Sequence, residues 1–228
     1  MLVIFDLDDT LIDTTGCLTP MKLELALHRM IKEGLVVPDF EQALSMLKRL
    51  DRQAESARQT LEEFIEIHAF DRKFLQVALE EVYEVVSDDL PVFPMEEAGE
   101  VLQELQQEHL LALVSIGNPA RQREKLKKAG IDSGLFCKIL ISEERNKQKP
   151  YELLLSGFHY HPEETIVCGD RIALDLTPAK QLGCKTVHMK RGRGVHSRGG
   201  EAIVDFTITT LRELQPVILH IQTTKGRQ

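Results

Sequence analysis

The sequence predicts a doubly wound α/β fold, a parallel β-sheet with helices packed against it, interrupted by an all-helical insert. Two observations predict the sheet. Short apolar runs of the kind that form strands buried on both faces occur at 2–5, 110–114 and 165–168. Helical patterns lie between these runs, as at 95–107 and 119–129, and strands that alternate with helices form parallel sheets through crossover connections.

The first predicted strand, 2–5, is wholly apolar and stops at the acidic cluster 6–9. The second run gives way to Ser115 and the third to Gly169 and Asp170, so that all three are followed by polar or small residues. Two later stretches have the composition of further strands, 185–189 and 206–208.

The segment 14–89 predicts the insert, because it contains no convincing strand and reads as several amphipathic helices. Apolar residues recur there at helical spacing, with Leu23, Leu27, Met30 and Ile31 on one face and Leu61, Phe64 and Ile65 on another. Pro91 and Pro94 mark the return to the sheet. We therefore expect a core formed by 1–13 and 90–228, and a helical subdomain, 14–89, over the carboxyl end of the first strand.

Composition and charge exclude several classes of protein. The 228 residues carry a formal net charge of −8, which disfavours a general nucleic-acid partner because phosphate backbones attract basic surfaces. No apolar stretch reaches the roughly 20 residues of a membrane-spanning helix, and no segment resembles a signal peptide. The four cysteines form no CxxC pair. We expect a cytoplasmic monomer or homodimer with no membrane or nucleic-acid partner.

Three aspartates stand where two predicted strands end. Asp6 and Asp8 are two residues apart, so in an extended chain their side chains share one side of the sheet. Asp170 follows the third apolar run. If these strands are neighbours, the carboxylates converge and require either raised pKa values or a cation. Oxygen ligands favour Mg²⁺, which proteins usually hold together with a substrate phosphate; the alternative for Asp6 and Asp8 is a solvated acidic turn.

A hydroxyl and a lysine complete the candidate site. Ser115, followed by Gly117 and by Pro119 at a predicted helix start, is a plausible phosphate clamp, or else a helix cap. Lys149 precedes Pro150, which suits the first position of a helix, and its charge could balance an aspartate and a phosphate. Lys147 is the competing candidate, and a simple exposed lysine is the alternative for both. We prefer Lys149.

Taken in order, these positions resemble the four motifs of the haloacid dehalogenase-like superfamily. Residues 5–11 look like motif I, the DxDxT signature formed by Asp6, Asp8 and Thr10; Ser115 resembles motif II, Lys149-Pro150 motif III, and the segment from Gly169 to Asp175 motif IV. The resemblance covers the whole chain. It implies a Rossmann-like core with a helical C1 cap, and an acid at position 8 implies the phosphatase branch rather than a dehalogenase.

The resemblance also implies a role for each residue. Asp6 would form an aspartyl-phosphate and Asp8 would serve as general acid and base. Mg²⁺ would be bound by Asp6, the backbone carbonyl of Asp8 and Asp170, with Asp175 as a ligand or as its support. Ser115 and Lys149 would hold the phosphoryl oxygens. The residues expected to bind the substrate are Thr10, Ser115, Ile116, Gly117 and Lys149.

We therefore expect a Mg²⁺-dependent phosphatase of a small phosphorylated metabolite. One alternative is a sugar phosphomutase of the β-phosphoglucomutase kind, which uses the same residues. The other is a non-catalytic binding protein that kept the fold. Ile116 favours the latter, because it stands where many relatives have the asparagine of Thr-Asn-Gly and cannot make its hydrogen bonds.

Overall fold

The computed structural model describes residues 1–68, 70–84, 90–200 and 202–225. The chain divides into two compact units, one made of Met1–Asp13 and Val92–Gln228 and the other of Thr14–Pro91. The boundary expected between residues 89 and 90 adjoins 85–89, which lie outside the described residues.

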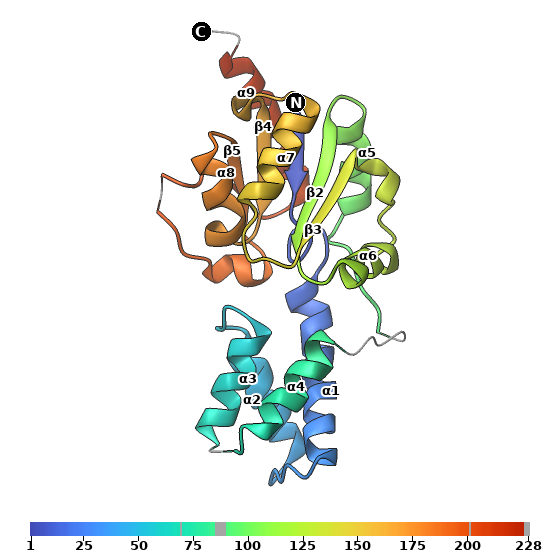
Figure 1. Cartoon of the computed structure of the whole chain (residues 1–228), viewed down its shortest axis with the longest axis vertical. Coiled ribbons are helices and arrows are strands. Elements are labelled where there is room, and N and C mark those ends of the chain that lie inside the picture. The colour runs from blue at the N-terminus through green and yellow to red at the C-terminus, as the bar shows by residue number, and fades with distance from the viewer. Residues whose placement is uncertain (69, 85–89, 201, 226–228) are drawn as a thin grey trace. The chain divides into compact units, whose positions relative to one another are not determined.

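The larger unit is built on a six-stranded sheet in which every neighbouring pair is parallel (Figure 1). The strand order is β3-β2-β1-β4-β5-β6. The strands are β1 (Leu2–Phe5), β2 (Leu110–Ile116), β3 (Lys138–Ser142), β4 (Thr165–Gly169), β5 (Lys185–Met189) and β6 (Phe206–Ile208). The predicted α/β fold is confirmed, and its predicted strands form at the expected places. Only β3 was missed.

Helices cover the sheet on both faces, which explains the continuous apolar runs. On one face Leu2 and Ile4 of β1 pack in a cluster with Tyr151 and Leu154 of α7 (Gln148–Phe158). Figure 1 shows α7 and α8 (Thr177–Gln181) on this face and α5 (Ala98–Gln106) on the other. The remaining helices of this unit are α6 (Pro119–Lys128) and α9 (Leu214–Lys225). The connections contain the one-turn segments η2 (Ser133–Leu135), η3 (Pro162–Glu164), η4 (Ile172–Leu176), η5 (Gly192–His196) and η6 (Leu211–Glu213).

The register of the sheet aligns the ends of its central strands. Phe5, the last residue of β1, pairs with Leu113 of β2 and with Cys168 of β4. The backbone N–H of Asp6 still donates to the carbonyl of Cys168, at 2.9 Å. Residues that follow β1 and β4 therefore emerge side by side at the carboxyl edge of the sheet, where parallel α/β folds bind their ligands.

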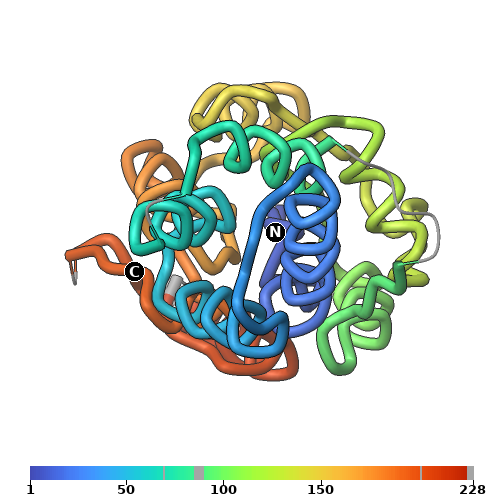
Figure 2. The backbone as a smooth tube through the Cα atoms, turned by 90° about the horizontal axis from the view of Figure 1, so that it is seen from below, coloured from blue at the N-terminus to red at the C-terminus, as the bar shows by residue number. Residues whose placement is uncertain are grey.

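The smaller unit consists of helices and the turns that connect them, with no strand among the residues that the structure describes. It begins with the turn η1 (Thr14–Leu18) and continues in α1 (Thr19–Lys32), α2 (Phe40–Asp51), α3 (Ala57–Ile67) and α4 (Lys73–Tyr83), which can be followed from blue to green in Figure 2. Helix α1 packs on α4 and α2 on α3. The predicted apolar faces form its core, since Leu23, Leu27, Leu61 and Phe64 are fully buried.

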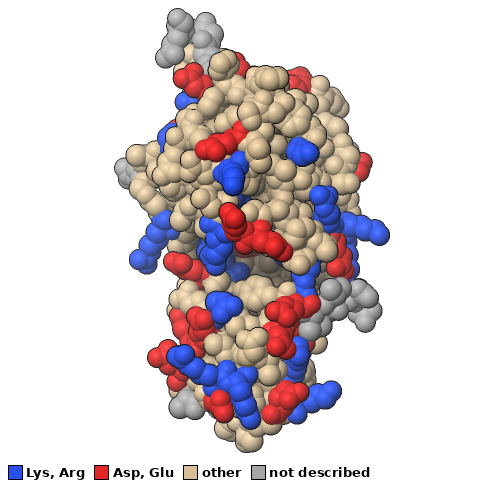
Figure 3. Space-filling view, in the orientation of Figure 1, with Lys and Arg blue, Asp and Glu red and all other residues tan. Residues whose placement is uncertain are grey.

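Charges of both signs are interspersed on the surface of the helical unit, on the face that Figure 3 shows. Among the residues described, the structure contains no helix with the length and apolar character needed to cross a bilayer.

Candidate active site

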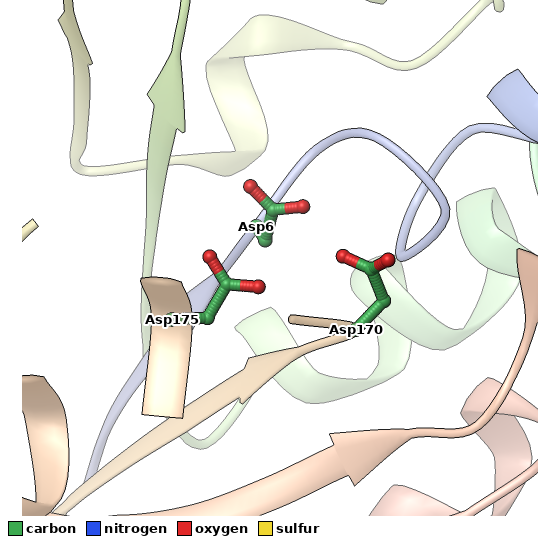
Figure 4. A group of neighbouring side chains, drawn as sticks. All are labelled: Asp6, Asp170 and Asp175. Carbon is green, nitrogen blue, oxygen red and sulfur yellow. The ribbon is translucent and has the colours of Figure 1, made fainter. Parts of the chain in front are cut away.

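Three carboxylates converge at the carboxyl edge of the sheet (Figure 4). Asp6 follows β1, Asp170 follows β4, and Asp175 lies in η4, the turn after β4. One oxygen from each carboxylate lies within 4.8 Å of the others. All three residues are buried, with exposed fractions of 7 %, 2 % and 2 %. Convergence was expected for the carboxylates of Asp6, Asp8 and Asp170. It is found for Asp6 and Asp170, and the third carboxylate of the cluster is that of Asp175 and not that of Asp8.

Lys147 is the cation of this cluster. Its ammonium group donates to Oδ1 of Asp6 at 2.5 Å and lies 2.7 Å from Oδ1 of Asp175. The Lys147 side chain is 1 % exposed. A buried lysine that contacts two carboxylates is an ion-pair partner and not a solvated surface residue.

The preference for Lys149 is corrected by this geometry. Helix α7 begins at Gln148, so Pro150 is its third residue and Lys147 occupies the N-cap position. Lys147 therefore points to the carboxylates, whereas Lys149 lies in the first turn and is exposed to solvent. The prediction failed because a proline is acceptable throughout the first turn of a helix, where its missing N–H costs no hydrogen bond.

The carboxylates of the cluster outnumber its ammonium group. With all three carboxylates ionised, they and Lys147 would carry a formal charge of −2. Burial raises the pKa of Asp6 to about 7, although the Lys147 ammonium opposes the shift. Burial, together with the charges of Asp175 and Asp6, raises the pKa of Asp170 well above its usual range. Buried oxygen ligands with this excess of negative charge fit a divalent cation such as Mg²⁺.

Lys147 itself keeps its charge. Burial disfavours the ammonium form, but the carboxylates of Asp175 and Asp6 outweigh that effect and raise the pKa of Lys147 well above its usual value. The lysine is therefore a permanent positive charge beside Asp6 throughout the physiological pH range.

Asp175 is fixed by the backbone around it. Its Oδ2 accepts a hydrogen bond from the N–H of Arg171 at 2.8 Å, while Oδ1 contacts Lys147. Gly169 makes room for it, because a Cβ atom at that position would lie 2.6 Å from Asp175 Oδ2. With both oxygens engaged, Asp175 holds the lysine in place.

The carboxylate of Asp8 is held by two side chains of helix α6, which are 114 and 117 positions later in the sequence. Its Oδ1 accepts from Nζ of Lys125 and its Oδ2 from Nε2 of Gln122, both at 2.7 Å. Its carboxylate is not a member of the three-aspartate cluster. Neither Gln122 nor Lys125 was predicted as a site residue; they stand three residues apart and so share one face of a helix, a signal too common to single them out.

Ser115 contacts the same Gln122 side chain as Asp8 but is more deeply buried, with an exposed fraction of 1 %. Its Oγ accepts a hydrogen bond from Nε2 of Gln122 at 2.7 Å. The alternative of a helix-cap serine is excluded, because Asn118 caps α6 by accepting from the N–H groups of Ala120 and Arg121. Asn118 is therefore engaged with the helix.

The other residues expected to bind the substrate are Gly117, Ile116 and Thr10. Gly117 adopts a φ of +140°, which favours glycine, and its backbone passes against the side chain of Gln122. The carbonyl of Ile116 accepts from Nε2 of Gln122 at 3.2 Å. Thr10 is fully buried, and its hydroxyl has no hydrogen-bond partner among the described residues. Its backbone N–H instead closes the turn after β1 onto Leu7, at 3.4 Å.

Comparison with known proteins decides the family. The family model described as haloacid dehalogenase-like hydrolase matches residues 1–183. The chain belongs to this family. Both the predicted family and the predicted class of enzyme are confirmed, because curated relatives that cover most of the chain are named as phosphatases.

Two of these relatives are named glyceraldehyde 3-phosphate phosphatase. The one from Pyrococcus furiosus is 29 % identical over 95 % of this chain and 92 % of its own length. The one from Pyrococcus abyssi is 31 % identical over 84 % of this chain and 82 % of its own length. The chain therefore spans most of the length of these two relatives.

Solved structures of the family share the fold. A haloacid dehalogenase-like family hydrolase from Xanthomonas campestris matches with a TM-score of 0.67 and 18 % identity, over 100 % of this chain and 98 % of that one. A putative β-phosphoglucomutase from Thermotoga maritima matches with a TM-score of 0.65 and 18 % identity, over 96 % of this chain and 98 % of that one. At this identity the likeness is one of fold alone.

Proposed function

We propose that this hydrolase is a Mg²⁺-dependent phosphatase of a small phosphorylated metabolite, with Asp6 as its nucleophile. The observation that carries the proposal is the placement of Asp6, whose buried carboxylate touches Lys147 and faces Asp170 and Asp175. A carboxylate is the nucleophilic form of this side chain, and the fixed positive charge of Lys147 beside it attracts an anionic substrate.

Hydrolysis proceeds in two balanced steps. In the first, a carboxylate oxygen of Asp6 attacks phosphorus, the bond from phosphorus to the ester oxygen breaks, and the carboxyl group of Asp8 gives its proton to the leaving oxygen. In the second, Asp8 takes a proton from water, the water oxygen attacks phosphorus, and the bond between phosphorus and Asp6 breaks. Free phosphate leaves, and Asp6 and Asp8 return to their starting forms.

The metal site of the proposal consists of Asp6, Asp170 and the backbone carbonyl of Asp8. When bound there, Mg²⁺ supplies positive charge to the phosphoryl oxygens. Lys147 supplies a second positive charge beside Asp6, and the Ser115 hydroxyl supplies a donor for the phosphoryl group. Asp175 acts on the reaction through Lys147, which it holds by an ion pair of 2.7 Å.

Glyceraldehyde 3-phosphate is the first substrate to test, because the curated relatives are named for it. The same names favour a phosphatase over a phosphomutase, since the β-phosphoglucomutase neighbour shares only the fold.

The experiment is a phosphate-release assay on purified protein with glyceraldehyde 3-phosphate, phosphoglycolate, nucleoside monophosphates and glucose 1-phosphate, each with Mg²⁺ and with EDTA. We expect release that needs Mg²⁺ and that the Asp6→Asn variant, shown to be folded by circular dichroism, has lost. Conversion of glucose 1-phosphate to glucose 6-phosphate without phosphate release would instead support the mutase. Absence of turnover on the whole panel would support a binding protein.

A further inference from the structure

We propose that Gln122 and Lys125 are positioning residues, which hold the carboxyl group of Asp8 in the orientation from which it gives a proton to the leaving oxygen. This inference rests on the proposed function. It starts from one observation: both oxygens of Asp8 accept a hydrogen bond from helix α6, Oδ2 from Gln122 and Oδ1 from Lys125, each at 2.7 Å. Two donors on two different oxygens fix the plane of a carboxylate, whereas a single ion pair leaves it free to rotate.

Gln122 is suited to this task because it is itself held in place. It is buried, with 4 % exposed, and lies one turn after Asn118, the residue that caps α6. Its side chain packs on Gly117, where a Cβ atom would lie 3.5 Å from it. Because its surroundings are closely packed, the Gln122 amide is held in one position, in contact with Asp8 after β1 and with Ser115 in β2.

The same amide joins the two groups on which the proposed chemistry depends. The Nε2 atom carries two hydrogens, and its two 2.7 Å contacts reach Oδ2 of Asp8 and Oγ of Ser115. Because Ser115 accepts this hydrogen bond, its own O–H can donate to a phosphoryl oxygen. Gln122 thus sets the distance between the proton donor Asp8 and the phosphate contact Ser115.

Lys125 adds charge to the arrangement. Its side chain is 25 % exposed and that of Asp8 is 30 % exposed, so as a stabilising ion pair the contact is worth little. Its proposed effect is on the reaction and not on stability. When the Asp8 proton has passed to the leaving oxygen, the carboxylate that remains is the form to which an ammonium and an amide N–H donate most strongly.

A positioning role predicts different losses of kcat/KM on alkyl and aryl phosphates, which a purely structural role does not. An alkyl ester leaves as a strongly basic alkoxide and needs the proton from Asp8, whereas p-nitrophenolate is a weak base and leaves without it. Misplacing Asp8 should therefore slow cleavage of the alkyl ester far more than that of the aryl ester. The value of kcat/KM reports steps up to formation of the phosphorylated enzyme, which is where Asp8 acts as an acid.

The test compares Lys125→Met and Gln122→Leu with wild type on p-nitrophenyl phosphate and on the alkyl phosphate that wild type hydrolyses fastest. For Lys125→Met we expect kcat/KM to fall about 10- to 100-fold on the alkyl phosphate and less than about 3-fold on the aryl phosphate. Gln122→Leu also removes the hydrogen bond to Ser115, so it should lower kcat/KM on both esters, and more on the alkyl phosphate. Lys125→Arg should recover most of the loss. The matched control is Lys127→Met, which removes an exposed lysine from the same helix and should leave both values unchanged.

Equal losses on the two esters, or no loss on either, would overturn the inference while leaving the proposed function intact. A wild-type protein that hydrolyses neither ester would overturn both. If Gln122→Leu, a change at a buried position, does not fold, the Met and Arg variants of the partly exposed Lys125 decide the test.

Discussion

The ammonium group of Lys147 lies 2.5 Å from Oδ1 of Asp6, and both side chains are almost completely buried. The two residues come from the start of α7 and the end of β1, which are 141 positions apart in the sequence. Because the same ammonium also touches Asp175, it ties together loops that follow three separate strands.

A matched pair of variants tests which lysine serves the proposed reaction. Lys147→Met should lower kcat/KM for phosphate release by roughly 10²- to 10³-fold, the loss typical of removing one preorganised positive group from a site of charge development. Lys149→Met should behave as wild type, because Lys149 is exposed. The measurement is steady-state kinetics of both proteins, with circular dichroism as the check of folding. The opposite order of losses would contradict the placement of Lys147.

Gly169 should be intolerant of even a methyl group. A Cβ atom there would lie 2.6 Å from the Asp175 carboxylate, so Gly169→Ala should displace Asp175, lower activity, and cost about 1–3 kcal/mol of unfolding free energy. Gly157→Ala is the control, since a Cβ at that position of α7 meets nothing within 4 Å. It should stabilise the helix by roughly 0.5–1 kcal/mol. Urea unfolding of both variants measures these changes, and equal effects would refute the steric explanation.

Metal binding should stabilise the protein more at alkaline than at acidic pH. The pKa of Asp6 is raised to about 7 in the folded protein without metal, so between the unfolded-state pKa and about 7 the folded state binds more protons than the unfolded state. Its stability should therefore fall as the pH rises through this window. Mg²⁺ takes the place of those protons.

The measurement for this prediction is thermal unfolding with Mg²⁺ and with EDTA, at about pH 5 and about pH 8. The increase in Tm caused by Mg²⁺ should be larger at the higher pH and should be reduced in Asp6→Asn. A pH-independent increase would show that the raised carboxyl pKa is not linked to the metal.

Asp205 accepts from Nζ of Lys180 and from the N–H of Thr186, at 2.5 and 2.9 Å. Burial works in the opposite direction, yet these donors hold the pKa of Asp205 below its usual value. Its contribution is therefore present above the unfolded-state pKa and is lost as the pH falls through the lower folded-state value.

Asp205→Ala should accordingly lower the unfolding free energy by about 1 kcal/mol at neutral pH, with a smaller difference from wild type in acid. Glu163→Gln changes an exposed carboxylate and serves as the control, with no expected effect. Urea titrations at several pH values measure both. A difference for Asp205→Ala that grows toward low pH would contradict the sign of the shift.

The central strands and their aspartates were predictable because both signals are local. A strand buried on both faces is a continuous apolar run, and the first polar residue after it lies at the edge of the sheet, as Asp6 and Asp170 do. The edge strand β3 was missed for the converse reason. Its apolar run, 139–141, is only three residues long and four of its five residues are only half-buried, so the sequence signal is weaker than that of the fully buried strands.

The lysine and the helix α6 contacts were not predictable, because they depend on rotation about a helix axis and on distant parts of the chain. A shift of two residues in the start of α7 moves the inward side chain from Lys149 to Lys147. Gln122 and Lys125 meet Asp8 across 114 and 117 residues of sequence. On their own helix they look like ordinary solvated polar residues.

The most direct measurement is the detection of a phosphoryl group on Asp6. Asp8→Ala removes the base of the second step, whereas p-nitrophenyl phosphate needs no acid in the first, so this variant should accumulate the phosphorylated enzyme. We predict a burst of about one p-nitrophenol per enzyme, and, after acid quench and peptide mapping by mass spectrometry, one phosphoryl group at Asp6. A burst with the phosphoryl group on another residue, or turnover by wild type with no burst and no phosphorylated peptide in the variant, would contradict nucleophilic attack by Asp6.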